Sequence, residues 1–348
     1  MLDRLVRQTL RVRPDELIYL TRDPINAETP LGRQVGPITP ASRHYVRDHF
    51  AIPEAREDLT IDGAVRAPLR LTLDDVRSLP RRSLVVTLEC AGNGRAFLDP
   101  PTAGEQWRTG AVGTAEWTGA SLHNVLEMAG PLASAIEVLC VGADAGTPAD
   151  VGARIAYERS LPLADALGDD MLLAYAMNGD DLPPEHGAPL RLVVPGWYGM
   201  ASVKWLVRLR LLERPFEGFF QTKRYVVGDR PLRDIAARAV IASPREGERV
   251  AARPFVARGY AWSGRGDVAR VEVSVDGGHG WHDAQIGDAL SRYAWREWHA
   301  TIAPRASGRM VLLARAVTSD GAAQPLTQVR NDLGYENNAV RPVEIEVV

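Results

Sequence analysis

The chain has 348 residues, of which 45% are hydrophobic and 24% charged, and its formal net charge is −3. This length and composition are typical of a soluble globular protein with two domains, and the near-neutral charge argues against a nucleic-acid or polyanion binder. Its two cysteines, Cys90 and Cys140, exclude a disulfide framework, a CxxC metal pair and a CxxCH haem site.

The first residues, "MLDRLVRQTLRVRPDELIYL", do not resemble an export signal. Arginines and an aspartate interrupt the segment in which a signal peptide needs its apolar region. No uninterrupted apolar run reaches the roughly 20 residues of a membrane span. We therefore expect a cytoplasmic protein without a membrane span, with a periplasmic location as the alternative where an export signal has been removed.

Up to about residue 240 the sequence mixes short strand-like and helical segments. Residues 121–130, "SLHNVLEMAG", place apolar side chains on one helical face and stop at Gly130. Residues 135–142 and 190–196 are typical of buried strands that end in turns. The helical segments are short and do not alternate regularly with strands, so an α+β domain over residues 1–240 is favoured over a doubly wound sheet. No GxGxxG or GxxxxGK[ST] motif marks a nucleotide site.

From about Ala242 the pattern changes to short strands separated by turns. Residues 268–286 alternate valines with polar residues and then turn at an Asp-Gly-Gly, a strong hairpin signal. Residues 309–321 and 341–348 are further strands of the same kind. We therefore expect an immunoglobulin-like β-sandwich over residues 241–348.

This second part holds more large aromatic residues than a domain of about 100 residues usually needs in its core. We therefore expect some of them to lie in an interface between two subunits. They are Trp262, Trp281, Tyr293, Trp295 and Trp298.

The stretch 85–95, "VVTLECAGNGR", joins an apolar strand to a cysteine, two glycines and an arginine. Cys90 on its own is most simply a small buried side chain. A Cys–His hydrolase needs a histidine that no feature of the sequence nominates, and a zinc site needs more ligands than the exposed-looking pair His279 and His282. The remaining alternative is a metal held by one cysteine and by a cofactor that supplies the other ligands.

Five segments occur in the order found in the sulfite oxidase family of molybdenum enzymes. Residues 87–95, "TLECAGNGR", resemble its CAGN-(R)-R signature, and residues 43–49, "RHYVRDH", resemble its F-x-x-R-N-H. Residues 107–122 and 172–206 are close to its WRTG and NGxxLPxxHG…SVKWL segments, and residues 259–278 resemble the start of its dimerisation domain. This resemblance implies an α+β molybdopterin domain, an immunoglobulin-like dimerisation domain and a homodimer.

By this resemblance the cofactor is molybdenum–molybdopterin, whose dithiolene supplies two sulfur ligands while Cys90 supplies a third. The pterin phosphate implies a second group of cationic and polar residues. The matching cofactor-binding positions are Tyr45, His49, Asp144, His186, Arg191, Ser202, Val203 and Lys204.

The resemblance also implies a pocket for a small oxyanion. Sulfite is strongly hydrated, and arginine suits its capture because it stays charged and donates in a planar fork. The matching catalytic residues are Arg47, Arg95, Trp107 and Tyr225. The implied reaction is oxygen-atom transfer that oxidises sulfite to sulfate, with two electrons leaving singly to an external acceptor such as a cytochrome.

Two positions depart from the family pattern. Gly94 stands where the family has the first of two arginines, and Leu333 is the closest match to a further substrate arginine near the C-terminus, with Arg330 as its neighbour in sequence. These departures leave another oxyanion or an S- or N-oxide, nitrate included, as the alternative substrate. A non-catalytic binding module is the alternative of a different class. Cys140, on an apolar strand, is expected to be a core residue.

Overall fold

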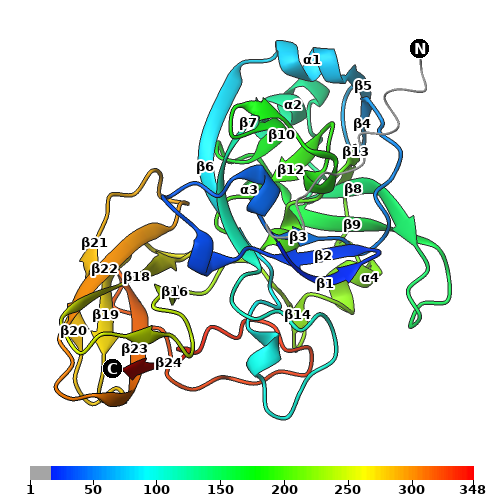
Figure 1. The fold of residues 1–348 in the computed structure, drawn as a ribbon. Coiled ribbons are helices and arrows are strands. Elements are labelled where there is room, and N and C mark those ends of the chain that lie inside the picture. The colour runs from blue at the N-terminus through cyan, green and yellow to red at the C-terminus, as the bar shows by residue number, and fades with distance from the viewer. Residues whose placement is uncertain (1–16) are drawn as a thin grey trace, which may run out of the picture.

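The computed structural model describes residues 17–348, and it divides into a larger N-terminal part and a smaller β-sandwich (Figure 1). Our expectation of a cytoplasmic location falls largely on residues 1–16, which lie outside the described residues, and it stays a prediction. Among residues 17–348, no helix has both the length and the apolar character that crossing a membrane requires.

Three sheets build the N-terminal part. One is a small antiparallel sheet in the order β1 (Ile18–Arg22), β2 (Ile25–Glu28) and β3 (Val46–Arg47). A second contains β11 (Asp180–Asp181), β10 (Leu172–Met177), β7 (Val112–Ser121) and β6 (Arg81–Glu89), with β12 (Arg191–Val193) paired to β10. The third has the order β5 (Leu69–Thr72), β4 (Asp58–Gly63), β13 (Leu206–Leu212), β8 (Glu137–Gly146) and β9 (Ile155–Pro162), in which β13 and β4 are parallel.

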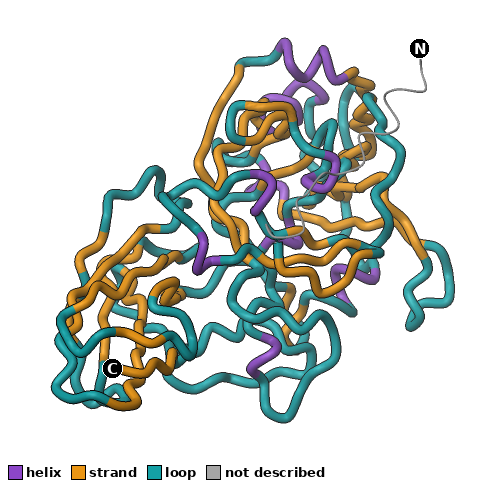
Figure 2. The backbone as a smooth tube through the Cα atoms, viewed as in Figure 1, coloured by secondary structure: helices purple, strands orange, loops and turns teal. Residues whose placement is uncertain are grey.

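Helices in this part are short, as Figure 2 shows. The longest is α2 (Leu122–Ala129), which begins after Ser121 and ends at Gly130 with a positive φ of 66°, as the sequence predicts. The others are α1 (Leu73–Ser78), α3 (Leu163–Ala166) and α4 (Phe219–Thr222), and a two-stranded ribbon of β14 (Val226–Val227) and β15 (Arg230–Pro231) leads to the sandwich. The α+β prediction is confirmed.

The C-terminal part is the predicted immunoglobulin-like sandwich of two sheets. One has the order β16 (Arg238–Ser243), β18 (Phe255–Trp262), β22 (Arg296–Ile302) and β21 (Gln285–Ile286). The other has the order β17 (Arg249–Val250), β24 (Val343–Val347), β23 (Gly308–Thr318), β19 (Val268–Ser274) and β20 (His282–Asp283). The expected boundary between residues 240 and 241 falls inside β16, so the sandwich begins a few residues earlier.

The two parts share one apolar core. Trp262 and Trp295 pack into the same buried cluster as the N-terminal sheets, and Trp298 is buried inside the sandwich. Our expectation that the aromatic surplus faces outward is therefore wrong for these three tryptophans. Their indoles fill the junction and the sandwich, and Trp281 and Tyr293 are only partly exposed.

A long segment, residues 319–342, leaves the sandwich after β23 and returns to it at β24. Figure 1 shows this red segment crossing from the sandwich to the cyan region around residues 95–100. Two hydrogen bonds anchor it there. Asn337 Nδ2 donates to the carbonyl oxygen of Gly94 at 2.8 Å, and the backbone N–H of Glu336 donates to the carbonyl oxygen of Ala91 at 3.0 Å. We call residues 319–342 the crossover loop.

Candidate active site

Cys90 lies at the end of β6, the strand that runs down to the junction of the two parts (Figure 1). Nine consecutive residue pairs join β6 to β7, and the N–H of Cys90 extends this pairing by donating to Ala111 O at 2.9 Å. Asn93 then fastens the turn, since its Oδ1 accepts from the N–H of Ala111 and its Nδ2 donates to Glu89 Oε1 at 2.9 Å. The thiol is therefore held on a fixed backbone.

The two glycines after Cys90 lie so close to specific neighbours that a side chain at either position would clash with them. A Cβ on Gly92 would lie 2.5 Å from Arg95 Nη1, so this glycine leaves room for the guanidinium. Gly94 has a φ of +90°, and a Cβ there would lie 2.8 Å from the backbone oxygen of Asn337 in the crossover loop. A glycine at position 94, where the family has an arginine, therefore leaves room for the crossover loop to approach closely.

Two cavities meet at Cys90. The inner cavity has a free volume of about 60 Å³ and the outer cavity about 380 Å³. Both are lined by Arg47, His49, Cys90 and Tyr225.

The inner cavity brings together seven of the eight expected cofactor-binding residues. They are Tyr45, His49, Asp144, His186, Arg191, Ser202 and Lys204. Val203 does not line it, because its side chain is fully buried in the core and its carbonyl oxygen accepts from the N–H of Leu192 at 2.8 Å. A role for Val203 through its backbone stays a prediction.

Positive charge gathers on the inner cavity. Arg191 donates to the carbonyl oxygens of His186 and Ser202 at 2.8 and 3.1 Å, and burial lowers its pKa to about 10, so it remains charged at pH 7. Lys204 donates to Asp48 Oδ1 and to Glu185 O, the latter at 2.9 Å. Burial lowers the pKa of Lys204, and the Asp48 carboxylate opposes this shift.

Buried carboxyl oxygens on the same cavity lack partners. Asp48 Oδ2, Asp144 Oδ1 and Glu185 Oε2 accept no hydrogen bond from the residues that the structure describes. Burial raises the pKa of Asp144 to about 7. Orphaned buried acceptors are costly, so this cavity suits a ligand that brings N–H donors together with an anionic group.

The outer cavity holds all four expected catalytic residues, Arg47, Arg95, Trp107 and Tyr225. Arg95 is only 5% exposed and donates to Glu105 O at 3.0 Å and Leu333 O at 3.1 Å, while its Nε has no acceptor within the described chain. The fully buried Trp107 likewise has an unpaired Nε1. Two arginines on the lining, Arg47 and Arg95, favour an anion as the occupant.

A hydrogen-bonded chain links Arg47 to Tyr225. Arg47 Nη2 lies 2.8 Å from His49 Nδ1, and His49 Nε2 lies 2.6 Å from Tyr225 Oη. Burial, with the nearby Arg47, lowers the pKa of His49 well below its ordinary value, so the imidazole is neutral at pH 7. Since arginine only donates, Nδ1 accepts, Nε2 carries the hydrogen, and Tyr225 Oη accepts it. The hydroxyl hydrogen of Tyr225 is therefore left for another acceptor.

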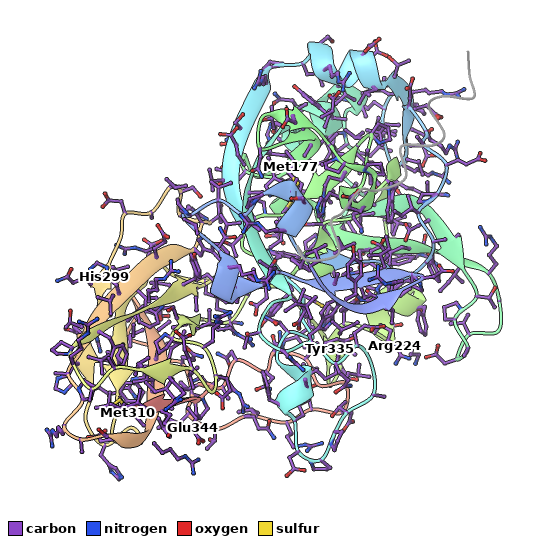
Figure 3. All side chains as sticks on the ribbon, in the orientation of Figure 1. Met177, Arg224, His299, Met310, Tyr335 and Glu344 are labelled. Carbon is purple, nitrogen blue, oxygen red and sulfur yellow. The ribbon has the colours of Figure 1, made fainter. Side chains whose placement is uncertain are left out.

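The crossover loop supplies one wall of the outer cavity. Asp332, Leu333 and Tyr335 line it, and Figure 3 shows Tyr335 close to Arg224, which lines it too. Leu333 thus reaches the site, as its sequence match implies. Arg330 does not line the cavity and instead donates to Pro100 O at 2.9 Å, so it does not replace an arginine at Leu333.

Directly behind Cys90 lies a buried charge cluster that the sequence did not reveal. Glu89, 1% exposed, accepts from Trp262 Nε1 at 2.8 Å and forms an ion pair with Arg238 at 3.3 Å. Arg238 also donates to Asn93 O at 3.2 Å and to Asn337 O. Trp262 and Arg238 come from the sandwich, so the second part of the chain braces the cysteine loop.

Other residues missed by sequence reasoning lie beside recognised ones. Asp48 and His44 fall inside the segment "RHYVRDH" and could have been found there, whereas Glu185, Tyr157 and Tyr335 carry no local signal. Cys140 is fully buried in the core, and burial raises its pKa to about 12. His279 and His282 are exposed, and the described residues contain no group of three or more metal-binding side chains.

Two family models match most of the chain. The model of the oxidoreductase molybdopterin binding domain covers residues 49–220, and that of the Mo-co oxidoreductase dimerisation domain covers residues 229–348. The chain is thus an oxidoreductase of the molybdopterin-binding class.

Individual relatives identify the family within this class. Mitochondrial sulfite oxidase from Homo sapiens is 34% identical over 97% of this chain and 67% of its own length, and sulfite oxidase from Arabidopsis thaliana is 33% identical over 87% and 86%. The crystal structure of the sulfane dehydrogenase SoxCD from Paracoccus pantotrophus superposes with a TM-score of 0.82 at 32% identity, covering 94% of this chain and 87% of that one. The chain belongs to the sulfite oxidase family, although it spans only about two thirds of the human relative.

The chemistry of the residues present fits molybdenum–molybdopterin, the cofactor of this family. At about 60 Å³ the inner cavity is smaller than this cofactor, so its walls must move apart on binding. Because the described residues offer no cluster of metal ligands beyond a single cysteine, the metal needs a cofactor that brings its own sulfur ligands. Arg191 and Lys204 suit the phosphate, and the unpaired Asp144 Oδ1 suits a pterin N–H. Cys90 stands between this cavity and the outer one, as a metal ligand that faces a substrate must.

Proposed function

We propose that this enzyme oxidises sulfite to sulfate and passes the electrons one at a time to an external acceptor. The observation that carries the proposal is the pair of arginines, Arg47 and Arg95, on the cavity that shares Cys90 with the cofactor cavity. The similarity to proteins named sulfite oxidase supports the same substrate.

Bound molybdenum–molybdopterin supplies two-electron redox chemistry and the transfer of an oxygen atom. The protein binds and orients the anion. Arg47 and Arg95 offset its charge. Tyr225, whose Oη accepts from His49 Nε2, keeps its own hydroxyl hydrogen for the substrate or for a replacing water. Aromatic and aliphatic walls limit the water around the reacting sulfur.

The electrons need an acceptor outside the chain, because the sequence has no CxxCH haem motif and no nucleotide-binding motif. A cytochrome suits this role because sulfite gives up two electrons and a haem takes one at a time. We therefore expect a soluble cytochrome as the partner.

Metal analysis followed by anaerobic titration tests the proposal. Protein from a cofactor-competent host should contain close to one molybdenum per chain, and sulfite should reduce it with a molybdenum EPR signal while nitrate, S-oxides and N-oxides should not. Less than about 0.1 molybdenum per chain would reject the enzyme. If sulfite failed to reduce the molybdenum, or if nitrate or an S-oxide reoxidised it, the alternative substrates would be favoured.

We also propose a homodimer formed mainly by the sandwich, since that part matches a dimerisation domain. The exposed apolar side chains Val256 and Leu290 are candidates for its surface in place of the buried tryptophans. Sedimentation equilibrium decides this, because one chain weighs 38.0 kDa. A species of single-chain mass at micromolar concentration would reject the dimer.

A further inference from the structure

The outer cavity is larger than a sulfite ion requires. Sulfite has only four heavy atoms, and a cavity needs about 10–15 Å³ of free volume to hold one water molecule. The cavity has a free volume of about 380 Å³, and its lining runs from Cys90 to exposed residues such as Asp150 and Asp332. A substrate with a substituent beyond its reacting group can therefore be accommodated.

The walls of this cavity are chemically divided. Its unpaired donors, Arg95 Nε and Trp107 Nε1, belong to residues near Cys90. The rest of the lining is mixed. It carries charged side chains, among them Arg47, Glu105, Asp150, Arg224 and Asp332, next to apolar and aromatic side chains from four separate parts of the chain, Phe50, Pro148, Phe219, Phe220, Leu333 and Tyr335.

Leu333 is the point at which the two kinds of wall meet. Its carbonyl oxygen accepts from Arg95 Nη2 at 3.1 Å, which fixes the loop against the anion-binding residue, while its partly buried side chain adds an apolar surface. An oxygen atom placed against that surface would lose its hydrogen bonds to water without replacement. A carbon substituent at the same place would lose nothing.

We propose that the enzyme also oxidises organic sulfinates, R–SO₂⁻, to sulfonates, R–SO₃⁻. A sulfinate keeps the lone pair on sulfur, one of the two negative charges of sulfite and two acceptor oxygens, and replaces the third oxygen of sulfite by carbon. The inference rests on the proposed function, because it uses the same site and the same oxygen-atom transfer.

The reaction balances as R–SO₂⁻ + H₂O → R–SO₃⁻ + 2H⁺ + 2e⁻. One S–O bond forms, sulfur is oxidised by two electrons, and the new oxygen derives from water. Two equivalents of a one-electron acceptor, cytochrome c or ferricyanide, take up the electrons, and both protons leave to solvent.

The test compares sulfite, methanesulfinate and benzenesulfinate as substrates of the holoenzyme, with cytochrome c as acceptor and metal-free protein as the blank. In H₂¹⁸O each sulfonate should gain one labelled oxygen, detected by mass spectrometry. The phenyl group buries more apolar surface than the methyl group, so KM should be about tenfold lower for benzenesulfinate than for methanesulfinate.

Leu333→Arg places a cation on the apolar wall. The ratio of kcat/KM for benzenesulfinate to that for sulfite should fall at least about tenfold. The matched control is Val329→Arg, which adds the same charge to the crossover loop at a position that is 79% exposed and outside the cavity, and it should leave the ratio unchanged.

The outcomes separate this inference from the function on which it rests. Turnover of sulfite without labelled sulfonate from either sulfinate would overturn the inference alone. Turnover of neither substrate by molybdenum-loaded protein would overturn both. An unchanged ratio in Leu333→Arg would remove the apolar wall from the argument and with it the assignment of the sulfinate to this cavity.

Discussion

Replacing Arg238 by methionine tests whether the sandwich holds the cysteine loop through a buried charge. Arg238 is 5% exposed and faces Glu89, which is 1% exposed. In Arg238→Met the carboxylate keeps its bonds to Trp262 and Asn93 but loses its cation. Removing one partner of a buried pair typically costs about 3–5 kcal/mol, and we expect that loss in the free energy of unfolding.

The expected size of the effect in thermal unfolding follows from chain length. At about 2.1 cal/mol/K per residue, 348 residues give an unfolding entropy of roughly 0.7 kcal/mol/K. A loss of about 3–5 kcal/mol therefore lowers Tm by roughly 4–7 °C, which differential scanning calorimetry resolves. The molybdenum EPR signal should change as well, because Asn93 and the loop after Cys90 lose a donor.

Two further variants make the measurement decisive. Glu89→Gln combined with Arg238→Met removes both charges, so its Tm should recover at least part of the loss seen with Arg238→Met alone. The matched control is Arg265→Met, which breaks an exposed pair with Asp234 at 3.3 Å and should cost no more than about 0.5 kcal/mol. If the loss of Tm in the double variant equalled the sum of the losses in Arg238→Met alone and in Glu89→Gln alone, the reasoning would be refuted.

Three other predictions concern metal binding, the substrate and pH. Cys90→Ser should fold with an altered metal site and almost no turnover, because a hydroxyl is a poor substitute for a soft thiolate; wild-type activity would exclude Cys90 as a ligand. Arg47→Gln and Arg95→Gln should each raise KM for sulfite about 10- to 150-fold, from roughly 1.5–3 kcal/mol per charge-assisted contact, and an unchanged KM in both would reject the anion pocket. Burial raises the pKa of Glu28 from 4.5 to about 7, so between these values the folded protein keeps a proton that the unfolded chain has released, and the free energy of unfolding falls with rising pH by up to about 3 kcal/mol. Glu28→Gln should flatten that fall in denaturant titrations at pH 5 and 8, and an identical pH dependence in both proteins would contradict the assignment.

Local patterns predicted the elements well. The apolar face between Ser121 and Gly130 became α2, and the alternating valines before Asp276 became β19, because such periodicities reflect which side of a single element is buried. The site residues matched in sequence also converge on two adjoining cavities. Their match depended on motif spacing, which is itself local.

Contacts between distant segments could not be predicted in the same way. The pairing of Glu89 with Arg238 joins residues 149 positions apart, and no spacing rule connects them. The aromatic surplus was misjudged for a related reason, since counting tryptophans gives no information on the core that the two parts share at Trp262 and Trp295. Dividing the sequence into two domains assumes two separate cores and therefore misses a core that both parts share.

The crossover loop also sets the order in which the site is completed during synthesis. Cys90, Arg95 and Tyr225 precede the sandwich, so these site residues are synthesised before residues 332–335. Those residues are held from both sides by β23 and β24, whose pairing runs from Gly308↔Val347 to Leu312↔Val343. Until that pairing forms, the outer cavity lacks a wall and lies open toward the metal position. Completion of the outer cavity thus depends on the pairing of β23 with β24, two strands that do not themselves line it.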